Sequence, residues 1–283
     1  MFMSKIKITT DGTCDLSEDY LLMHSISIIP FHIKTDMGVF RDQEEITGEN
    51  LFEYVESKRP YPKTMPISEE EYRIFFREHS IKNEKVLHIS VSSGVSESYK
   101  NAALASTEFS NVIIIDSQHV SLGTGLLVAM AACLLKEGKD IEEIVTVLEK
   151  EKRKVSTSFI VPNLEHLQNR GRISLTKINI IGLLPIMPSF ILKDGIVSVT
   201  KYFFENKDRG CKRYVEYRLK GVRNIDTTVL YIVTSGCSQR FKDLILEEVR
   251  KHQSFDEIII SEASATVACQ CGKGSYGLIY KFR

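Results

Sequence analysis

The stretch Val86-Leu87-His88-Ile89-Ser90-Val91-Ser92-Ser93-Gly94-Val95-Ser96-Glu97-Ser98-Tyr99 joins an apolar run to a segment rich in small hydroxyl residues. The run 86–91 is typical of a buried strand, and a helix is predicted over 97–108. Gly94 permits a tight turn between them, and the first N–H groups of a helix lack partners within the helix. A strand that leads through hydroxyl groups into a helix N-terminus can hold an oxyanion.

The same pattern, a strand followed by small polar residues, occurs twice more in the first half of the chain. Thr9-Thr10-Asp11-Gly12-Thr13 follows a short strand predicted over 6–8, and Asp116-Ser117 follows the apolar run 112–115. Continuous apolar strands separated by helices favour a parallel sheet covered on both faces. Ligands bind at the carboxyl ends of such strands, so we expect the three strand ends to line one crevice.

The pattern of elements changes near residue 155. Before it strands and helices alternate, and Thr47 and Ser68 are predicted to cap helices. After it, residues 158–162 begin a new unit, and Asp194-Gly195 within 191–200 is a hairpin signal. Segments 229–234 and 277–282, a helix over 241–251 and a strand over 257–261 complete a mixed domain. The sequence therefore predicts an α/β protein with an N-terminal Rossmann-like parallel-sheet domain (1–155) and a C-terminal α+β domain (156–283).

Composition and charge argue against several classes of protein. The 283 residues include 37 basic and 37 acidic side chains, so no nucleic-acid-binding surface is expected. No apolar stretch reaches the roughly 18 to 20 residues that span a bilayer, and the first five residues lack the apolar core of a secretory signal. We expect a cytoplasmic protein with no transmembrane segment, whose six scattered cysteines are reduced thiols.

Ser92, Ser93 and Ser96 are the leading candidates for ligand binding, with a simple helix cap as the alternative. No histidine lies at an obvious triad spacing from Ser93, and no Gly-x-Ser-x-Gly motif is present, which argues against a serine hydrolase. Asp11 and Asp116 follow strands and either cap neighbouring loops or bind a metal. Capping is the favoured interpretation, because capping aspartates are frequent and no complete set of metal ligands is visible.

Other motifs allow more than one interpretation. Cys269-x-Cys271 lacks the second pair of a zinc site, and the glycine-rich segment 272–277 lacks Walker spacing. Thr64 lies in a predicted loop, where it donates a hydroxyl to the crevice or shapes the turn. The apolar segment 178–187 forms either core or the wall of a long apolar pocket.

Five segments, in this order, resemble motifs of one known family: 10–16, 62–68, 92–99, 116–117 and 170–174. Together they resemble the DegV family of bacterial fatty-acid-binding proteins over essentially the whole chain. The resemblance implies a two-domain protein that holds one long-chain fatty acid between its domains. The protein would not itself be an enzyme and would need no cofactor and no metal. It would present the fatty-acid carboxylate to a separate cytosolic fatty-acid kinase, which makes an acyl phosphate for phospholipid synthesis.

The resemblance also implies roles for particular residues. Thr64 and Ser93 would hold the carboxylate, with Ser92, Ser96 and Gln270 beside them. Arg172 would face the head group or the partner. The acyl chain would lie in an apolar tunnel that includes Ile178, Ile180, Ile181, Leu183, Leu184 and Ile186.

The chain departs from the family pattern at three places, and these keep other functions open. Glu97-Ser98 replaces Gly-Thr, Gln270 replaces a histidine, and Lys201-Tyr202-Phe203 replaces Lys-x-Arg. A glutamine donates a hydrogen bond but supplies no imidazolium. One alternative is a divergent relative that binds another small ligand or serves as an interaction module. Another is an enzyme or kinase subunit, because the N-terminal layout resembles folds of the dihydroxyacetone-kinase type.

Overall fold

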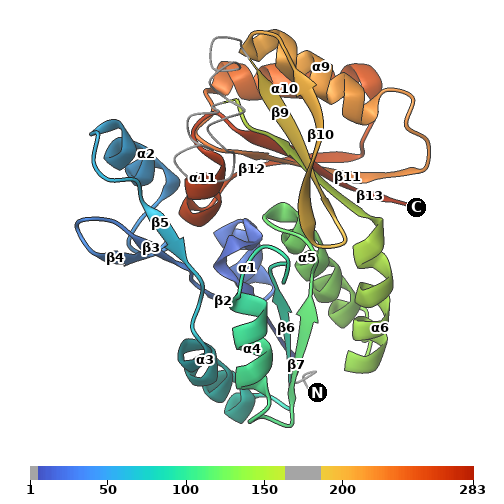
Figure 1. The fold of residues 1–283 in the computed structure, drawn as a ribbon. Helices are drawn as coiled ribbons and strands as arrows, with labels where there is room; N and C mark the ends of the chain where they lie inside the picture. The colour runs from blue at the N-terminus through green and yellow to red at the C-terminus, as the bar shows by residue number, and fades with distance from the viewer. Residues whose placement is uncertain (1–5, 163–185) are drawn as a thin grey trace.

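The computed structural model describes residues 6–162 and 186–283, which form two large β-sheets with helices between and around them (Figure 1). The first sheet is parallel, with the order β2-β1-β6-β7. Its strands are β1 (Ile6–Asp11), β2 (Ser27–Ile29), β6 (Lys85–Ser90) and β7 (Val112–Asp116). Because β1, β6 and β7 are parallel neighbours, their carboxyl ends share one edge of the sheet, as the sequence predicts.

Helices cover both faces of this parallel sheet. They are α1 (Glu18–Met23), α3 (Glu69–Lys82), α4 (Ser98–Ser106), α5 (Leu122–Lys136) and α6 (Ile141–Glu151). Helices α3 and α4 pack on one face, around Phe76 and Ala102, while α5 packs on the other. The predicted cap at Ser68 is confirmed: Ser68 and Glu71 form a reciprocal capping box at the start of α3.

A small antiparallel sheet, which the sequence analysis did not predict, projects beside the parallel one. It has the order β4-β3-β5 and consists of β3 (His32–Lys34), β4 (Val39–Arg41) and β5 (Lys63–Met65), with α2 (Gly48–Glu56) next to it. The predicted cap of α2 at Thr47 is confirmed by its bond from the Asn50 N–H. Thr64 lies within β5 and not in a loop, so that prediction was wrong. Each of these strands has only three residues, which is too short to show a hydrophobic period in the sequence.

The second large sheet is mixed and has the order β10-β9-β8-β13-β11-β12. Its strands are β8 (Val155–Ile160), β9 (Met187–Lys193), β10 (Ile196–Phe203), β11 (Ile225–Thr234), β12 (Glu257–Glu262) and β13 (Tyr276–Phe282). The predicted hairpin is confirmed: Asp194 and Gly195 link β9 to β10 with φ values of 50° and 79°.

Among residues 186–283 the structure has three helices: α9 (Lys207–Leu219), α10 (Gln239–His252) and α11 (Ala265–Cys271). Helices α9 and α10 cover one face of the mixed sheet (Figure 1). The sequence analysis missed α9, whose many charged residues hide its short apolar stripe, and the short α11. Strand β8 begins at Val155, where the pattern of elements in the sequence changes.

Helix α5 lies between the two large sheets and joins them. Nine of its residues are buried, which explains why its sequence is apolar on all sides. Leu127 of α5 belongs to one hydrophobic cluster with Leu87 of the parallel sheet and with Val233 and Ile279 of the mixed sheet. The predicted α/β class, with a parallel-sheet part followed by a mixed-sheet part, is confirmed. The predicted domain boundary between residues 155 and 156 stays a prediction.

Candidate functional site

Asp11, at the end of β1, is a buried carboxylate with four hydrogen-bond donors. Its Oδ1 accepts from the Tyr72 hydroxyl at 2.5 Å and contacts His88 Nε2 at 3.1 Å. Its Oδ2 accepts from the Ser90 hydroxyl at 2.8 Å and from the Val91 N–H at 2.7 Å. Burial alone would raise the pKa of Asp11, but these partners, His88 foremost, hold it below its usual value. Asp11 therefore fixes the end of β6 through these hydrogen bonds, in agreement with the capping role favoured from the sequence.

Ser93 is bonded to Asp116 of the neighbouring strand. Its hydroxyl donates to Oδ2 at 2.5 Å and its N–H donates to Oδ1 at 3.2 Å, while the Gln118 N–H donates to Oδ1 at 2.9 Å. The turn after β6 is thereby fixed to the end of β7. Ser93 is exposed at this edge of the sheet, so its hydroxyl is accessible from solvent although it donates its hydrogen bond to Asp116.

Ser92 and Ser96 make bonds within the protein. The buried Ser92 hydroxyl donates to the Gly195 carbonyl at 2.7 Å, and its oxygen accepts from the Gly94 N–H at 3.2 Å. Ser92 thus ties the serine turn to the tip of the β9–β10 hairpin, which reaches down to it from the mixed sheet (Figure 1). Ser96 donates to the Ser98 hydroxyl at 3.0 Å.

The close approach of hairpin and turn requires glycine at position 94. A Cβ there would lie 2.5 Å from the Gly195 carbonyl oxygen and 3.3 Å from Ile196 Cγ1. Gly94→Ala is therefore expected to lower the free energy of unfolding by about 1–3 kcal/mol in urea denaturation. Gly48→Ala at the start of α2, where a Cβ meets only contacts of 3.4 Å and longer, is the control and should be close to neutral. Equal stability of the two variants would contradict the hairpin contact.

Thr64 and Gln270 are brought together although they lie far apart in the chain. Gln270 on α11 donates its Nε2 hydrogen to Thr64 Oγ1 on β5 at 2.6 Å, and both residues are half-buried. Since the threonine oxygen accepts this bond, the hydroxyl hydrogen is left to donate elsewhere. No acceptor for that hydrogen lies in the described part of the chain. The Thr64–Gln270 pair is thus a donor site, and no hydrogen bond joins it to Ser92, Ser93 or Ser96.

An apolar hollow is lined by residues that are close in sequence to Thr64 and Gln270. A hollow of about 190 Å³ between α2 and α11 is lined by Leu51, Phe52, Val55, Glu56, Tyr61, Pro62, Ala268, Cys269 and Lys273. Pro62 and Cys269 are close sequence neighbours of Thr64 and Gln270. The structure therefore combines polar donors with apolar walls where α11 meets the small sheet.

Two buried aspartates hold α11, and with it Gln270, against the N-terminal half. Asp42 accepts the N–H groups of Ala265 and Thr266, each at 2.9 Å. Asp15 accepts the Ser264 N–H at 3.0 Å and the Ser121 hydroxyl. The sequence analysis did not single out either aspartate, because their partners are more than 100 residues away.

Asp15 makes the stability of this junction depend on pH. Burial raises its pKa to about 7, whereas the unfolded-state pKa is about 3.9. Between these values the folded state binds more protons, so the free energy of unfolding falls as pH rises. We expect wild type to lose up to about 1.4 kcal/mol per pH unit relative to Asp15→Asn between pH 5 and 7. Urea denaturation across this range measures the difference. A constant difference would contradict a buried, titrating Asp15.

Most of the remaining predicted residues lie outside the described residues. Arg172, Ile178, Ile180, Ile181, Leu183 and Leu184 lie outside the described residues. Ile186 is buried just before β9. Glu97 is exposed and lies at the N-cap of α4, where its side chain makes no capping hydrogen bond.

The described residues offer neither a metal-binding cluster nor a membrane-spanning helix. No group of three or more His, Cys, Asp and Glu side chains in 6–162 and 186–283 has a geometry that would hold a metal ion. In the same residues, no helix combines the length and the apolar character needed to cross a membrane.

Comparison with known proteins identifies the family. A model of the DegV family, described as a family of uncharacterised proteins, matches residues 5–283. The chain belongs to the DegV family. A DegV domain-containing protein of Clostridium perfringens is 29% identical over 216 residues, 76% of each chain.

Solved DegV structures share the fold. A DegV family protein from Thermus thermophilus, described by its fatty-acid binding, has a TM-score of 0.86 and 28% identity, with 99% of this chain and 100% of that chain covered. DegV from Bacillus subtilis, described as a fatty acid binding protein, has a TM-score of 0.81 and 23% identity, with 99% and 100% covered. Both structures are described by fatty-acid binding, and both share the fold of this chain.

Proposed function

We propose that this DegV protein binds a long-chain fatty acid between its two sheet-containing parts, with the acyl chain in an apolar tunnel. The observation that carries the proposal is the similarity along nearly the whole chain to the Thermus thermophilus protein described by its fatty-acid binding. The Thr64–Gln270 pair supports it, because it presents a hydroxyl donor at the junction between the small sheet and α11.

The head group is held, in this proposal, mainly by Thr64 and Gln270. A carboxylate that leaves water needs several charge-assisted hydrogen bonds to offset its lost hydration. The Thr64 hydroxyl and the second Nε2 hydrogen of Gln270 supply two donors. The Ser93 hydroxyl supplies a third donor when it rotates away from Asp116. The Ser92 hydroxyl does not, because it donates to the Gly195 carbonyl. Gln270 thus takes over the hydrogen-bonding part of the family histidine without its positive charge.

The tail supplies most of the binding free energy. Each buried methylene contributes about 0.8 kcal/mol, so a long acyl chain stabilises the complex even with a modest head-group site. Palmitate should therefore bind to delipidated protein in isothermal titration calorimetry, with one molecule per chain. Hexadecanol, which has the same tail and no carboxylate, should bind more weakly. No uptake of palmitate by folded, delipidated protein would overturn the proposal.

The proposal extends to the fate of the ligand. The protein acts as a non-catalytic cytoplasmic carrier, which presents the carboxylate to a fatty-acid kinase that makes an acyl phosphate for phospholipid synthesis. Palmitate-loaded protein incubated with ATP alone should give no acyl phosphate, trapped as the hydroxamate with hydroxylamine. Addition of the cytosolic fraction of the source cells should give the hydroxamate. Hydroxamate formed by the purified protein and ATP alone would show an enzyme instead.

A further inference from the structure

Asp42 is a buried carboxylate that joins the small sheet to α11. It follows β4 directly, the residue is 1% exposed, and its N–H donates to the Phe31 carbonyl at 2.9 Å. Its two side-chain oxygens accept the first two N–H groups of α11, those of Ala265 and Thr266, each at 2.9 Å. Asp42 therefore holds the beginning of α11 on the small sheet with both oxygens of its carboxylate.

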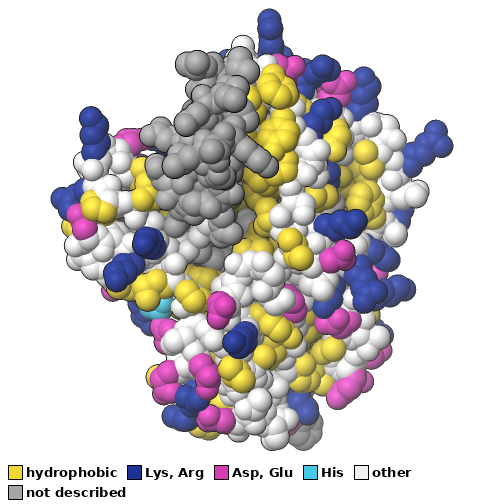
Figure 2. Space-filling model, viewed as in Figure 1, with side chains coloured by type: hydrophobic (Ala, Val, Ile, Leu, Met, Phe, Trp, Pro, Cys, Tyr) yellow, Lys and Arg dark blue, Asp and Glu magenta, His cyan; other side chains and the backbone are white. Residues whose placement is uncertain are grey.

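No cation pairs with Asp42 in the described part of the chain. Lys34, Arg41 and Lys63 of the small sheet are exposed, and Figure 2 shows Lys and Arg side chains on the outer surface of this part of the molecule. Burial raises the pKa of Asp42 above its usual value, although its hydrogen bonds to α11 oppose this shift. A buried carboxylate without a cation costs free energy, which indicates a role other than general stabilisation.

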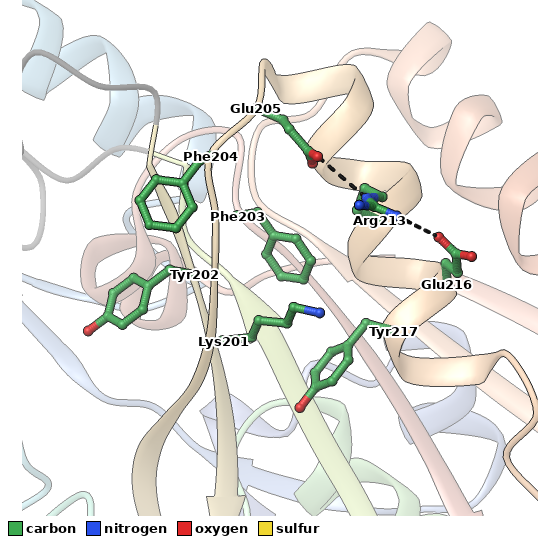
Figure 3. A pocket seen from close by; sticks show the side chains of 8 residues that line it. All are labelled: Lys201, Tyr202, Phe203, Phe204, Glu205, Arg213, Glu216 and Tyr217. Atoms are coloured by element: carbon green, nitrogen blue, oxygen red, sulfur yellow. Dashed lines mark hydrogen bonds and ion pairs between the residues drawn. The ribbon is translucent and has the colours of Figure 1, made fainter.

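Other carboxylates of the molecule do have cationic partners. Beside a hollow of about 350 Å³ between β10 and α9, Glu205 and Glu216 pair with Arg213 at 3.4 Å and 3.6 Å (Figure 3). On α10, the buried Glu248 pairs with Lys251 at 3.1 Å. The carboxylate at the end of β4 differs from these acids, because its partners are backbone N–H groups of one short helix.

Helix α11 connects Asp42 to the proposed head-group site. It has seven residues, which is about two turns, with the contacts of Asp42 at its first residues and Gln270 near its last. Between them, Ala268 belongs to one hydrophobic cluster with Ile33, the β3 residue that pairs with Thr64. A two-turn helix that is held at its start cannot slide along the small sheet. The contact at Asp42 therefore sets where Gln270 lies against Thr64.

We propose that Asp42 is a positioning residue for fatty-acid binding. By holding the start of α11, it places the Gln270 amide on the Thr64 hydroxyl and keeps the hydrogens of both groups directed at the ligand carboxylate. This role rests on the proposed fatty-acid binding and acts through Gln270, without contact between Asp42 and the ligand. In Asp42→Asn an NH₂ group replaces one acceptor oxygen, faces a backbone N–H and displaces the start of the helix.

Isothermal titration calorimetry of the delipidated full-length chain with palmitate and with hexadecanol tests this role. Asp42→Asn should weaken palmitate binding at least about fivefold, because the charge-assisted hydrogen bonds to the carboxylate lose their geometry. Hexadecanol binding should change less than about twofold, since its tail contacts are unaltered and its neutral hydroxyl gains less from the same donors. Glu248→Gln alters a buried carboxylate whose partners lie on its own helix, so this matched control should leave both affinities unchanged.

A second background separates positioning from general damage. In Gln270→Ala, the further change Asp42→Asn should alter palmitate affinity less than about twofold, because the side chain that Asp42 positions is already absent. Ala265→Pro is the second variant if Asp42→Asn does not fold. It removes one N–H group that Asp42 accepts, at the first helical position, where proline is tolerated, and it should weaken palmitate binding in the same way.

The outcomes distinguish this role from the proposed function. If wild type binds palmitate and Asp42→Asn binds it equally well, the positioning role is overturned and the proposed function stands. An equal loss of palmitate and hexadecanol binding, or an equal loss of palmitate binding in the wild-type and Gln270→Ala backgrounds, would also overturn the positioning role. Wild type that binds no palmitate would overturn the proposed function, and this role with it.

Discussion

Asp11→Ala is expected to lower the free energy of unfolding by about 3–5 kcal/mol, the largest effect we expect from a single substitution outside the hydrophobic core. The substitution removes a buried carboxylate and leaves the Tyr72 hydroxyl, the Ser90 hydroxyl and the Val91 N–H without their acceptor. Each buried donor left unsatisfied costs about 1–3 kcal/mol, less where the site relaxes or admits water. Urea denaturation followed by circular dichroism measures the loss.

Asp226→Ala is the matched control for this prediction. Its carboxylate also accepts hydrogen bonds, from Thr228, and pairs with Lys281, but its side chain is 29% exposed. Water can replace the lost partners there, so we expect a loss below about 1 kcal/mol. If Asp11→Ala cost no more than Asp226→Ala, the strand-end network would not anchor β6 as described.

Thr64→Val is expected to weaken palmitate binding by roughly 10- to 100-fold and to lower the free energy of unfolding by about 0.5–1.5 kcal/mol, because Gln270 loses its acceptor. The substitution keeps the shape of the side chain but removes the hydroxyl donor, and a hydrogen bond to a charged group contributes about 1.5–3 kcal/mol. Isothermal titration calorimetry with delipidated protein measures the change. Because the tail contacts are unaltered, hexadecanol binding should change much less.

Thr64→Ser separates the hydroxyl from the rest of the side chain. It retains the donor and the acceptor for Gln270, so its palmitate affinity should stay within about threefold of wild type, the scatter expected for a lost methyl contact. Equal palmitate affinity for wild type and Thr64→Val would place the head group elsewhere. Ser93→Ala would then be the next variant to compare, because Ser93 is the exposed serine at the sheet edge.

The parallel sheet could be predicted from the sequence because its strands carry continuous apolar runs. The runs before Ser92 and Asp116 are long enough to show a buried strand, and polar residues mark where each ends. Capping pairs such as Ser68 and Glu71 lie three residues apart, so their signal is local. Asp194-Gly195 likewise predicted the hairpin, since its turn type requires positive φ at both positions.

The rest of the site depends on contacts between distant parts of the chain. Gln270 and Thr64 are 206 positions apart in the sequence, and Asp42 is more than 220 positions from the residue of α11 that it binds. No local pattern marks such partners, and only the family resemblance placed Thr64 and Gln270 in one site. The three serines of the turn are equivalent candidates in the sequence, but the structure gives them different roles. Ser92 donates a hydrogen bond to the hairpin, Ser96 donates one to Ser98, and of the three only Ser93 is exposed.

The central claim is that this chain carries a fatty acid. The most direct measurement is mass spectrometry of the purified protein, first intact under native conditions and then after extraction with organic solvent. We predict a mass excess equal to one long-chain fatty acid per chain and an equimolar amount of that acid in the extract. Purified protein without any mass excess, which also takes up no palmitate after delipidation, would contradict the claim.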